Sequence, residues 1–269
     1  MILTKALAAG SAFMVAKGYI NTFRPEVNHV TITTKQPLGL PRLTILHLSD
    51  IHIEKLSISA EKIKRLTKGQ RFDLIALTGD YLDQINSIPH FLYFLEQIST
   101  IPTRFGLFAV WGNHDWLIAS HLPKLKRQME ALGVTVLDNR SVTVTHQTGR
   151  FHIIGVDDHH SGHAKPELAF RAVPNDGFRL VLTHDPALVR SIGHPFDYLL
   201  CGHLHSGQIY YPLPIHSLTW GFKPFRHHLS GLHYSPYGPY YISAGLGQTG
   251  PNLRIGCRPE VTIHHIVNA

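Results

Sequence analysis

Hydrophobic runs that stop abruptly at polar residues dominate the chain from residue 43 onward. The five clearest are LTILHLSD, FDLIALTGD, FGLFAVWGNHD, FRLVLTHD and FDYLLCGHLH, over residues 43–50, 72–80, 105–115, 178–185 and 196–205. Because these runs are apolar on consecutive positions, we expect strands covered on both faces, as in a layered α/β protein. Helical spacing between the runs predicts helices that begin after Ser59 and after Ser87, and a third over 116–132 that Gly133 ends.

The residues between the third and fourth runs show a different hydrophobic pattern, with apolar and polar positions in alternation. VTVLDN, SVTVTH and FHIIGV predict short strands of a second, partly antiparallel sheet, with a hairpin turn over 146–150. YYISAG and EVTIHHI predict the last strands. The irregular stretches 157–177 and 211–239 are candidates for functional loops, because loops of this length are uncommon in compact domains. Since the composition shows no break after residue 22, we predict one domain over 23–269.

The amino-acid composition argues against some classes of function but does not identify one. The chain has 269 residues, of which 43% are hydrophobic. This is enough for a hydrophobic core that is stable without disulfides or structural metal ions. Its two cysteines argue against a disulfide framework and against a thiol-rich zinc site. The chain carries 21 histidines, and its net charge of +7 favours anionic partners such as phosphates, nucleic acid or an acidic lipid surface.

The first 22 residues form a separate unit. Lys5 is followed by an apolar-to-small stretch from Ala6 to Ala16, which is shorter than the roughly 20 apolar residues that span a bilayer. Its large apolar residues recur at roughly helical spacing, which predicts a membrane-proximal or signal-like helix over 1–22. We favour peripheral attachment to a membrane surface. Export by a cleaved signal and a plain packing helix are the alternatives.

Polar residues that can bind metal or carry a proton end each of the five runs, and the carboxyl ends of strands are where ligand sites of such folds assemble. Asp50 and His52 are two positions apart, as are His203 and His205, so each pair projects to one side of an extended segment. The candidate metal ligands are Asp50, His52, Asp80, Asn113, His184, His203 and His205. Oxygen and imidazole ligands suit Mn, Fe, Zn or Co better than Ca. Their number suits two ions that share one carboxylate, and we expect Asp80 to be shared.

The ordered motifs DIH, GD, GNHD, THD and GHLH resemble the calcineurin-like metallophosphoesterase superfamily over about residues 43–205. The tail GLGQTGPNLRIGCRPEVTIHHI is similar to a bacterial membrane-associated branch that includes UDP-2,3-diacylglucosamine pyrophosphohydrolases of lipid A synthesis. The resemblance implies a four-layer αββα sandwich, with two mixed β-sheets flanked by helices. It assigns one ion to Asp50, His52, Asp80 and His205, and the second to Asp80, Asn113, His184 and His203. It also implies that His114 is the general acid and that Asp115 orients it.

These features predict a dinuclear metal-dependent phosphoesterase. Two divalent or trivalent ions, Mn first and otherwise Fe, Zn or Co, activate a bridging water that attacks phosphorus, while His114 protonates the leaving oxygen. The expected substrate is a phosphodiester or a pyrophosphate. A nucleotide-linked lipid of the UDP-2,3-diacylglucosamine type is the candidate that membrane proximity favours.

Alternatives stay open at the level of the sequence. The basic charge favours a nuclease or cyclic-nucleotide phosphodiesterase on the same metal cage, but no cluster of basic and aromatic residues marks a nucleic-acid track, so nucleic acid is not the favoured partner. A metal-stabilised membrane-associated scaffold is the non-enzyme alternative. The glycines over 245–250 have dinucleotide-binding spacing, but Pro251 and a strand-like tail leave no room for the helix that this motif requires. His159, His160 and His163 are interpreted as a solvated loop, with a substrate or accessory metal site as the alternative.

Overall fold

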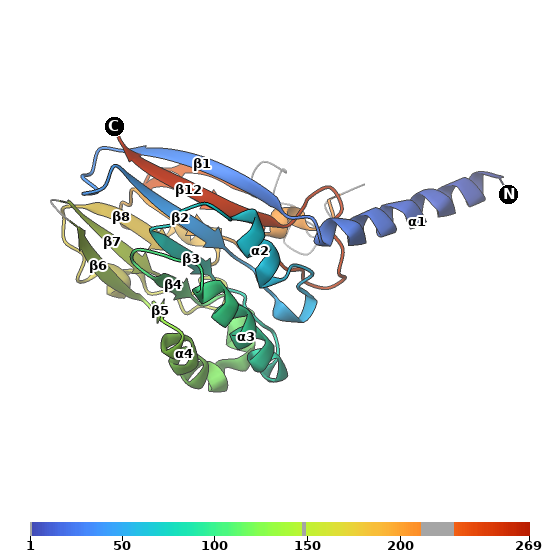
Figure 1. Cartoon of the computed structure of the whole chain (residues 1–269), viewed down its shortest axis with the longest axis horizontal. Helices are drawn as coiled ribbons and strands as arrows, with labels where there is room; N and C mark the ends of the chain where they lie inside the picture. The colour runs from blue at the N-terminus through green and yellow to red at the C-terminus, as the bar shows by residue number, and fades with distance from the viewer. Residues whose placement is uncertain (1, 147–148, 211–228) are drawn as a thin grey trace.

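Two six-stranded sheets packed against each other form the centre of the molecule (Figure 1). The computed structural model describes residues 2–146, 149–210 and 229–269, except for the side chains of residues 2–9. In spatial order, the first sheet consists of β1 (Glu26–Thr34), β12 (Glu260–Asn268), β2 (Arg42–Leu48), β3 (Leu74–Thr78), β4 (Leu107–Val110) and β5 (Val134–Val136). The second consists of β10 (Gly231–Ser235), β11 (Gly238–Ile242), β9 (Tyr198–Cys201), β8 (Phe178–Leu182), β7 (Gly149–Gly155) and β6 (Arg140–His146).

Both sheets are mixed, as the sequence predicts. Strands β2 to β5 run parallel, and β12 lies antiparallel to β2 and parallel to β1. In the second sheet β7, β8, β9 and β11 run parallel, while β6 and β10 are antiparallel edge strands. The carboxyl ends of β2, β3 and β4 therefore meet at one edge of the first sheet, and those of β8 and β9 meet at one edge of the second.

The strands are apolar on consecutive positions because both faces of each sheet are covered. In β3, Leu74 and Ala76 pack between the two sheets, whereas Ile75 and Leu77 face the helices outside. In β8, Leu180 likewise packs between the sheets and Val181 faces outward. Three hydrophobic layers of this kind make the four-layer αββα sandwich, so the predicted fold is confirmed.

Helices cover the outer faces. The first sheet is covered by α2 (Ala60–Leu66), α3 (Ile88–Ser99) and α4 (Leu122–Ala131), and the second by α5 (Pro166–Phe170) and the 3₁₀ helix Pro186–Arg190. Short 3₁₀ turns also occur at Ile53–Lys55, Ile85–Ser87, Asp115–His121 and His205–Gly207. Ser59 caps α2 as expected, because its hydroxyl accepts a hydrogen bond from the Lys62 amide. Ser87 does not cap α3, because the preceding 3₁₀ turn runs directly into that helix and leaves Ser87 in a helical conformation.

Two further expectations need correction. The helix predicted over 116–132 is a kinked 3₁₀ segment, Asp115–His121, followed by α4, because Pro123 has no amide hydrogen and excludes a continuous α-helix through this point. The strand from VTVLDN is β5, which pairs with β4 in the first sheet instead of joining the second. The predicted turn over 146–150 and the loop 211–239 fall partly on residues 147–148 and 211–228, outside the described residues.

The N-terminal helix α1 (Ile2–Thr22) leads away from the sheets, and its last turns contact the loops that hold Ser57 and Arg254 (Figure 1). The Arg254 amide donates to the Gly18 carbonyl at 2.9 Å, and the Asn21 side-chain amide donates to the Arg254 carbonyl at 2.9 Å. Further out, Phe13 and Val15 are exposed. Within the described part of the chain, no helix combines the length and the apolar character that crossing a membrane requires.

Candidate metal centre

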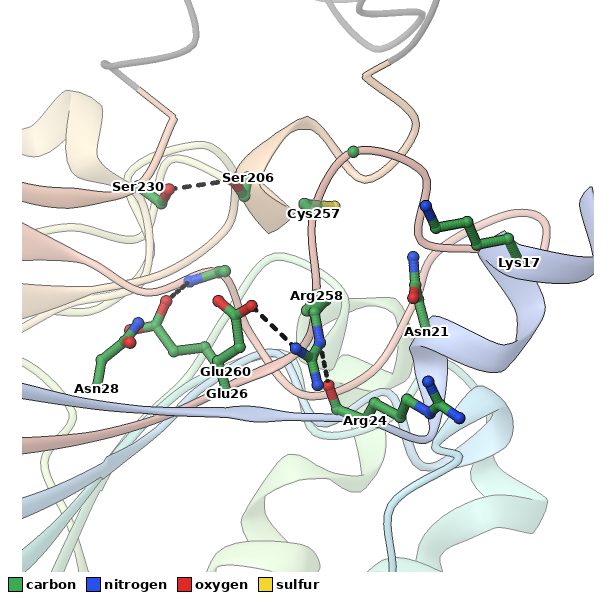
Figure 2. Close-up of a pocket in the computed structure, with 12 residues that line it drawn as sticks. Lys17, Asn21, Arg24, Glu26, Asn28, Ser206, Ser230, Cys257, Arg258 and Glu260 are labelled. Carbon is green, nitrogen blue, oxygen red and sulfur yellow. Dashed lines mark hydrogen bonds and ion pairs between the residues drawn. The ribbon is translucent and has the colours of Figure 1, made fainter. Parts of the chain in front are cut away.

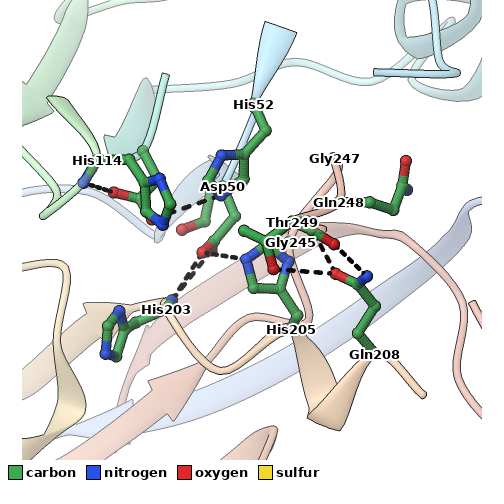
Figure 3. A network of polar contacts seen from close by, with 12 residues as sticks. Asp50, His52, His114, His203, His205, Gln208, Gly245, Gly247, Gln248 and Thr249 are labelled. Atoms are coloured by element: carbon green, nitrogen blue, oxygen red, sulfur yellow. Dashed lines mark hydrogen bonds and ion pairs between the residues drawn. The ribbon is translucent and has the colours of Figure 1, made fainter. Parts of the chain in front are cut away.

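The strand ends bring the predicted ligands of both sheets together. Asp50 and His52 follow β2, Asp80 follows β3, and Asn113 and His114 follow β4. His184 follows β8 of the second sheet, and His203 and His205 follow β9. Figure 3 shows side chains from both sheets turned toward one another at this edge.

One group of four buried side chains consists of Asp50, His52, Asp80 and His205. One ligating atom of each lies within 4.8 Å of the others, an arrangement that could hold a metal ion. His205 Nε2 is 3.3 Å from Asp50 Oδ1, and His52 Nε2 is 3.4 Å from Asp80 Oδ2. The spacing of the side chains therefore agrees with the ligand set expected for the first ion.

A second buried group contains Asp80, His184 and His203. His184 Nε2 is 3.0 Å from Asp80 Oδ2, and His203 Nδ1 is 3.2 Å from His184 Nε2. Asp80 thus belongs to both groups, as one carboxylate between two ions requires. The Asn113 Oδ1 atom is buried and makes no hydrogen bond within the described residues, so a cation would provide its missing partner.

The backbone at the centre is strained. Five of the candidate ligands have positive φ angles, which few residues other than glycine adopt: Asp50 (51°), His52 (40°), Asp80 (55°), His203 (74°) and His205 (46°). Such conformations cost about 1–3 kcal/mol each and persist where the surrounding structure holds them, most often at functional sites. Regular strands therefore end at the centre, and sharp turns aim the ligands into it.

Close backbone approach also builds the centre. A β-carbon on Gly112 would lie 2.2 Å from Asp80 Oδ1, so only glycine fits beside this carboxylate. The Gly247 amide donates to the Asp50 carbonyl at 2.7 Å, which holds the segment 245–250 against the turn after β2. The glycines of GLGQTG therefore support the candidate ligands, in agreement with the rejection of a dinucleotide-binding loop.

Burial and charge set the protonation of these groups in the metal-free protein. Burial lowers the pKa values of His203 and His205 well below the usual range, which leaves the neutral imidazoles that bind metals. Burial opposes ionisation of Asp80, yet the neighbouring His184 and His52 hold its pKa well below its usual range. His184 Nδ1 donates to the Thr78 carbonyl at 2.7 Å, which fixes the orientation of the ring and leaves Nε2, the atom that faces Asp80, as the one that would bind a metal ion.

His114 lies beside the candidate ligands, as expected, but its partner differs from the expected one. Its Nδ1 atom is 3.0 Å from Asp83 Oδ1, and His52 Nδ1 lies 3.1 Å from the same oxygen. Burial disfavours the His114 imidazolium, but the contact with Asp83 and the negative charges of Asp80 and Asp83 together outweigh burial and raise the pKa of His114 above its usual value. Asp83 is one residue that the sequence did not single out, because its place three positions after Asp80 does not show which nearby aspartate meets His114.

The hydrogen bonds that the structure gives Asp115 go to backbone amides, and none goes to the His114 ring that the sequence predicted it to orient. Its carboxylate accepts hydrogen bonds from the amides of Asp80, Tyr81 and Gly112 at 2.9, 2.8 and 2.8 Å. It is fully buried and ties the loop after β3 to the loop after β4. The reason is local geometry: Asp115 starts a 3₁₀ helix, and its side chain turns back to these amides.

Arg254 is a second residue that sequence reasoning missed. It is the largest fully buried side chain among the described residues, and its guanidinium donates to the carbonyls of His205, Ala244 and Gly245 at 3.0, 2.8 and 3.2 Å. Gln208, shown with His205 in Figure 3, binds Thr249 through both ends of its side-chain amide. These contacts fix the turn that carries His205.

The remaining histidines take different places. His160 lies near the centre, with its ring centroid 5.3 Å from that of His203, and His163 stacks on Trp116 at 3.4 Å. His159 and His160 are both exposed, as the interpretation of this stretch as a solvated loop predicts, whereas His163 is half-buried. His47 is buried and lies 2.8 Å from Thr78 Oγ1, beneath the centre, as expected of a packing residue.

Comparison with known proteins agrees with this geometry. The family model for calcineurin-like phosphoesterases matches residues 43–207. The chain is 42% identical over 251 residues to the metallophosphoesterase YkoQ of Bacillus subtilis, covering 91% of this chain and 92% of that protein. It is 32% identical over 231 residues to the phosphodiesterase YaeI of Escherichia coli, covering 83% and 82%. Among solved structures, phosphopantetheinyl hydrolase from Mycobacterium tuberculosis aligns over 80% of this chain and 95% of that chain with a TM-score of 0.47 and 10% identity, a likeness too distant to bear on function.

The family match covers more than half of the chain, and it includes every candidate ligand and His114. The relatives named above are matched over most of their own length. The buried aspartates and histidines supply the metal-binding groups that such hydrolases need. The chain belongs to the calcineurin-like phosphoesterase family and is a metal-dependent phosphoester hydrolase.

Proposed function

We propose that this enzyme hydrolyses a phosphodiester or a pyrophosphate on a dinuclear metal centre. The observation that carries the proposal is the position of Asp80 in two buried groups of candidate ligands at once. The likeness to a relative named as a phosphodiesterase favours a diester over a monoester. The first ion would be held by Asp50, His52, Asp80 and His205, and the second by Asp80, Asn113, His184 and His203.

The donor set fits such ions. It consists of carboxylate and amide oxygens and imidazole nitrogens, which suit Mn first, and otherwise Fe, Zn or Co. Ions of this kind, when bound in pairs, lower the pKa of a water molecule and neutralise the charge on a phosphoryl group. The buried Asn113 Oδ1, which lacks a partner among the described residues, and the five strained ligand positions support a site built to hold cations.

The chain itself supplies the proton for the leaving group. Asp83 holds His114 through Nδ1, so the other ring nitrogen, Nε2, is available to donate to a leaving oxygen. The raised pKa of His114 favours the protonated form that a general acid needs near neutral pH. Asp83 is thus a positioning residue for His114, a role that the sequence assigned to Asp115.

Membrane proximity is a separate proposal. A cavity of about 670 Å³ is lined mainly by the last turns of α1, the start of β1 and the segment 256–260 (Figure 2). Its lining includes three basic residues, Lys17, Arg24 and Arg258, and two acidic ones, Glu26 and Glu260, of which Glu26 pairs with Arg258 at 3.3 Å. Exposed Phe13 lies further out on the same helix as Lys17. Basic residues beside an exposed apolar helix suit an acidic lipid surface, and a nucleotide-linked lipid is the matching substrate.

This proposal is testable with vesicles. We expect the full chain to float with phosphatidylglycerol vesicles and to float less after Phe13→Ser. The exposed Tyr93 of α3 is the matched control, since Tyr93→Ser removes a large exposed side chain outside α1. Equal flotation of wild type and Phe13→Ser would contradict a membrane role for α1.

The test of the activity uses purified protein loaded with Mn and bis-p-nitrophenyl phosphate as the substrate. Changes to groups around metal ligands typically cost 10- to 100-fold, so we expect Asp80→Asn, which changes a ligand itself, to lose more than about 100-fold in kcat. Asp176→Asn is the control, because Asp176 is exposed and its carboxylate contacts Arg150 at the surface. Metal content is measured on each sample. Wild-type activity in Asp80→Asn, or inactive metal-loaded wild type, would refute the proposed function.

A further inference from the structure

A cavity of about 820 Å³ opens beside the candidate metal centre. His203 lines this cavity and also belongs to the second group of candidate ligands. His160, Asp185 and His203 each have a ligating atom within 4.8 Å of the others, so they mark the passage from the centre into the cavity. Small-molecule sites measure about 300–1,000 Å³, and a phosphate group alone would fill only a small part of this one.

Aromatic residues of the β10–β11 hairpin form part of the cavity wall. Tyr234 belongs to β10, Tyr237 to the turn and Tyr240 to β11, and all three line the cavity. Because β11 pairs with β9, the hairpin lies beside the strand that leads to His203. Tyr234 is 76% exposed, which leaves the face of a large aromatic ring available for stacking.

One cationic side chain and one carboxylate also line the cavity. Arg190 is exposed at the end of the 3₁₀ helix Pro186–Arg190 and lines the same cavity. The Asp185 carboxylate accepts a hydrogen bond from the Ala187 amide at 2.8 Å, so part of its acceptor capacity is used inside the protein. The cavity therefore combines ring faces with a positive charge that complements the negative charge of a phosphodiester.

We propose that this cavity binds the substituent that stays on phosphorus during hydrolysis, and that this substituent carries a planar aromatic ring. This inference rests on the proposed function and adds a substrate class to it. His114 does not line the cavity, and its described partners are Asp83 and His52. The group that receives a proton from His114 therefore leaves from another side of the centre, and the retained group faces the tyrosines. Stacking on tyrosine favours planar rings over small alkyl groups.

The experiment compares two diesters that share one leaving group, phenyl p-nitrophenyl phosphate and methyl p-nitrophenyl phosphate, with the Mn-loaded full chain. The measured quantity is the ratio of their kcat/KM values, and the change of this ratio on substitution cancels the different intrinsic reactivity of the esters. Losing a ring stack corresponds to roughly 5- to 150-fold, so Tyr234→Ala should lower the phenyl-to-methyl ratio by a factor in this range. Tyr234→Phe keeps the ring and should keep the ratio.

Tyr93→Ala is the matched control, because Tyr93 is 64% exposed on α3 and does not line the cavity. An unchanged phenyl-to-methyl ratio in Tyr234→Ala would overturn the inference while leaving the proposed function intact. Equal losses on both esters would place the shared p-nitrophenyl group in the cavity and would also overturn it. If the metal-loaded wild type hydrolyses neither ester, the proposed function fails and this inference fails with it.

Discussion

Two clusters of buried histidines lie close together in this fold, and they differ in backbone conformation and in the groups that the histidines contact. In the candidate metal centre, histidines surround two aspartates on turns with positive φ angles. Beneath it, His47 of β2 and His264 of β12 lie on regular strands between the sheets. The hydrogen bonds that the structure gives these two histidines go to Thr78, to Tyr198 and to each other, and none goes to a carboxylate.

The pKa values show what the difference means. Burial lowers the pKa of His47 to about 3, so this histidine is a neutral core residue at every physiological pH. His52 is equally buried, yet its contacts with Asp80 and Asp83 and the negative charges of Asp80 and Asp50 together outweigh burial and raise its pKa to about 10 in the metal-free protein. Contact with carboxylates therefore separates His52 and His184 from His47, whereas burial keeps His203 and His205 of the centre neutral, as it does His47.

The largest expected effect tests the comparison directly, with one histidine changed in each group. His114→Ala should lower kcat about 100- to 10,000-fold on a diester with an alkyl leaving group, because an alkoxide needs protonation to leave. The loss should be smaller on bis-p-nitrophenyl phosphate, since p-nitrophenolate leaves without a proton. His264→Leu changes the other cluster and should keep the activity of the folded protein. Similar losses in both variants, measured at equal metal content, would remove the distinction between the clusters.

The candidate ligands were predictable because of where they stand in the chain. Asp50, Asp80 and His184 closely follow buried strands that run parallel, and the topology carries such strand ends to one edge. Asp83 and Arg254 were not predictable in the same way. Their contacts join loops from different strands, and no spacing rule indicates which of two nearby aspartates meets His114.

The fold was predictable to a similar depth. The apolar runs predicted the buried strands, because a strand covered on both faces must be apolar on consecutive positions. Strand β5 was assigned to the wrong sheet, since three residues of alternating pattern carry no information about their neighbour. β1 was not predicted at all, because its alternation of exposed and buried positions is weak and its register depends on β12, which lies at the other end of the chain.

A smaller effect separates the two aspartates near His114. Asp83→Asn should lower kcat/KM by about 10- to 100-fold, as for other groups that orient metal-site histidines. It should also move the alkaline limb of the pH profile to lower pH, because Asp83 raises the pKa of His114 and the acid form would be lost earlier.

Asp115→Asn is the control for this shift, because it makes the same substitution at an aspartate near His114 whose carboxylate binds backbone amides. It should lower the free energy of unfolding by about 1–3 kcal/mol without moving the alkaline limb. The measurements are pH–rate profiles and urea unfolding of both variants. A shifted limb in Asp115→Asn with none in Asp83→Asn would restore the role that the sequence assigned to Asp115.

The smallest effect concerns the neutral cluster and the pH dependence of folding. His47 has a pKa of about 3 in the folded protein, against about 6.5 in an unfolded chain. The unfolded state therefore binds more protons between these values, so the stability from this histidine is complete above pH 6.5 and is lost as the pH falls toward 3. From pH 6.5 to 5.5 the loss from one such group is about 1 kcal/mol.

Urea unfolding of metal-free protein in EDTA measures this loss. The free energy of unfolding should decline less steeply with falling pH for His47→Leu than for wild type. His90→Leu, at an exposed position of α3, is the control and should keep the wild-type dependence of the free energy of unfolding on pH. The same dependence in His47→Leu as in wild type would mean that His47 is not held neutral by burial.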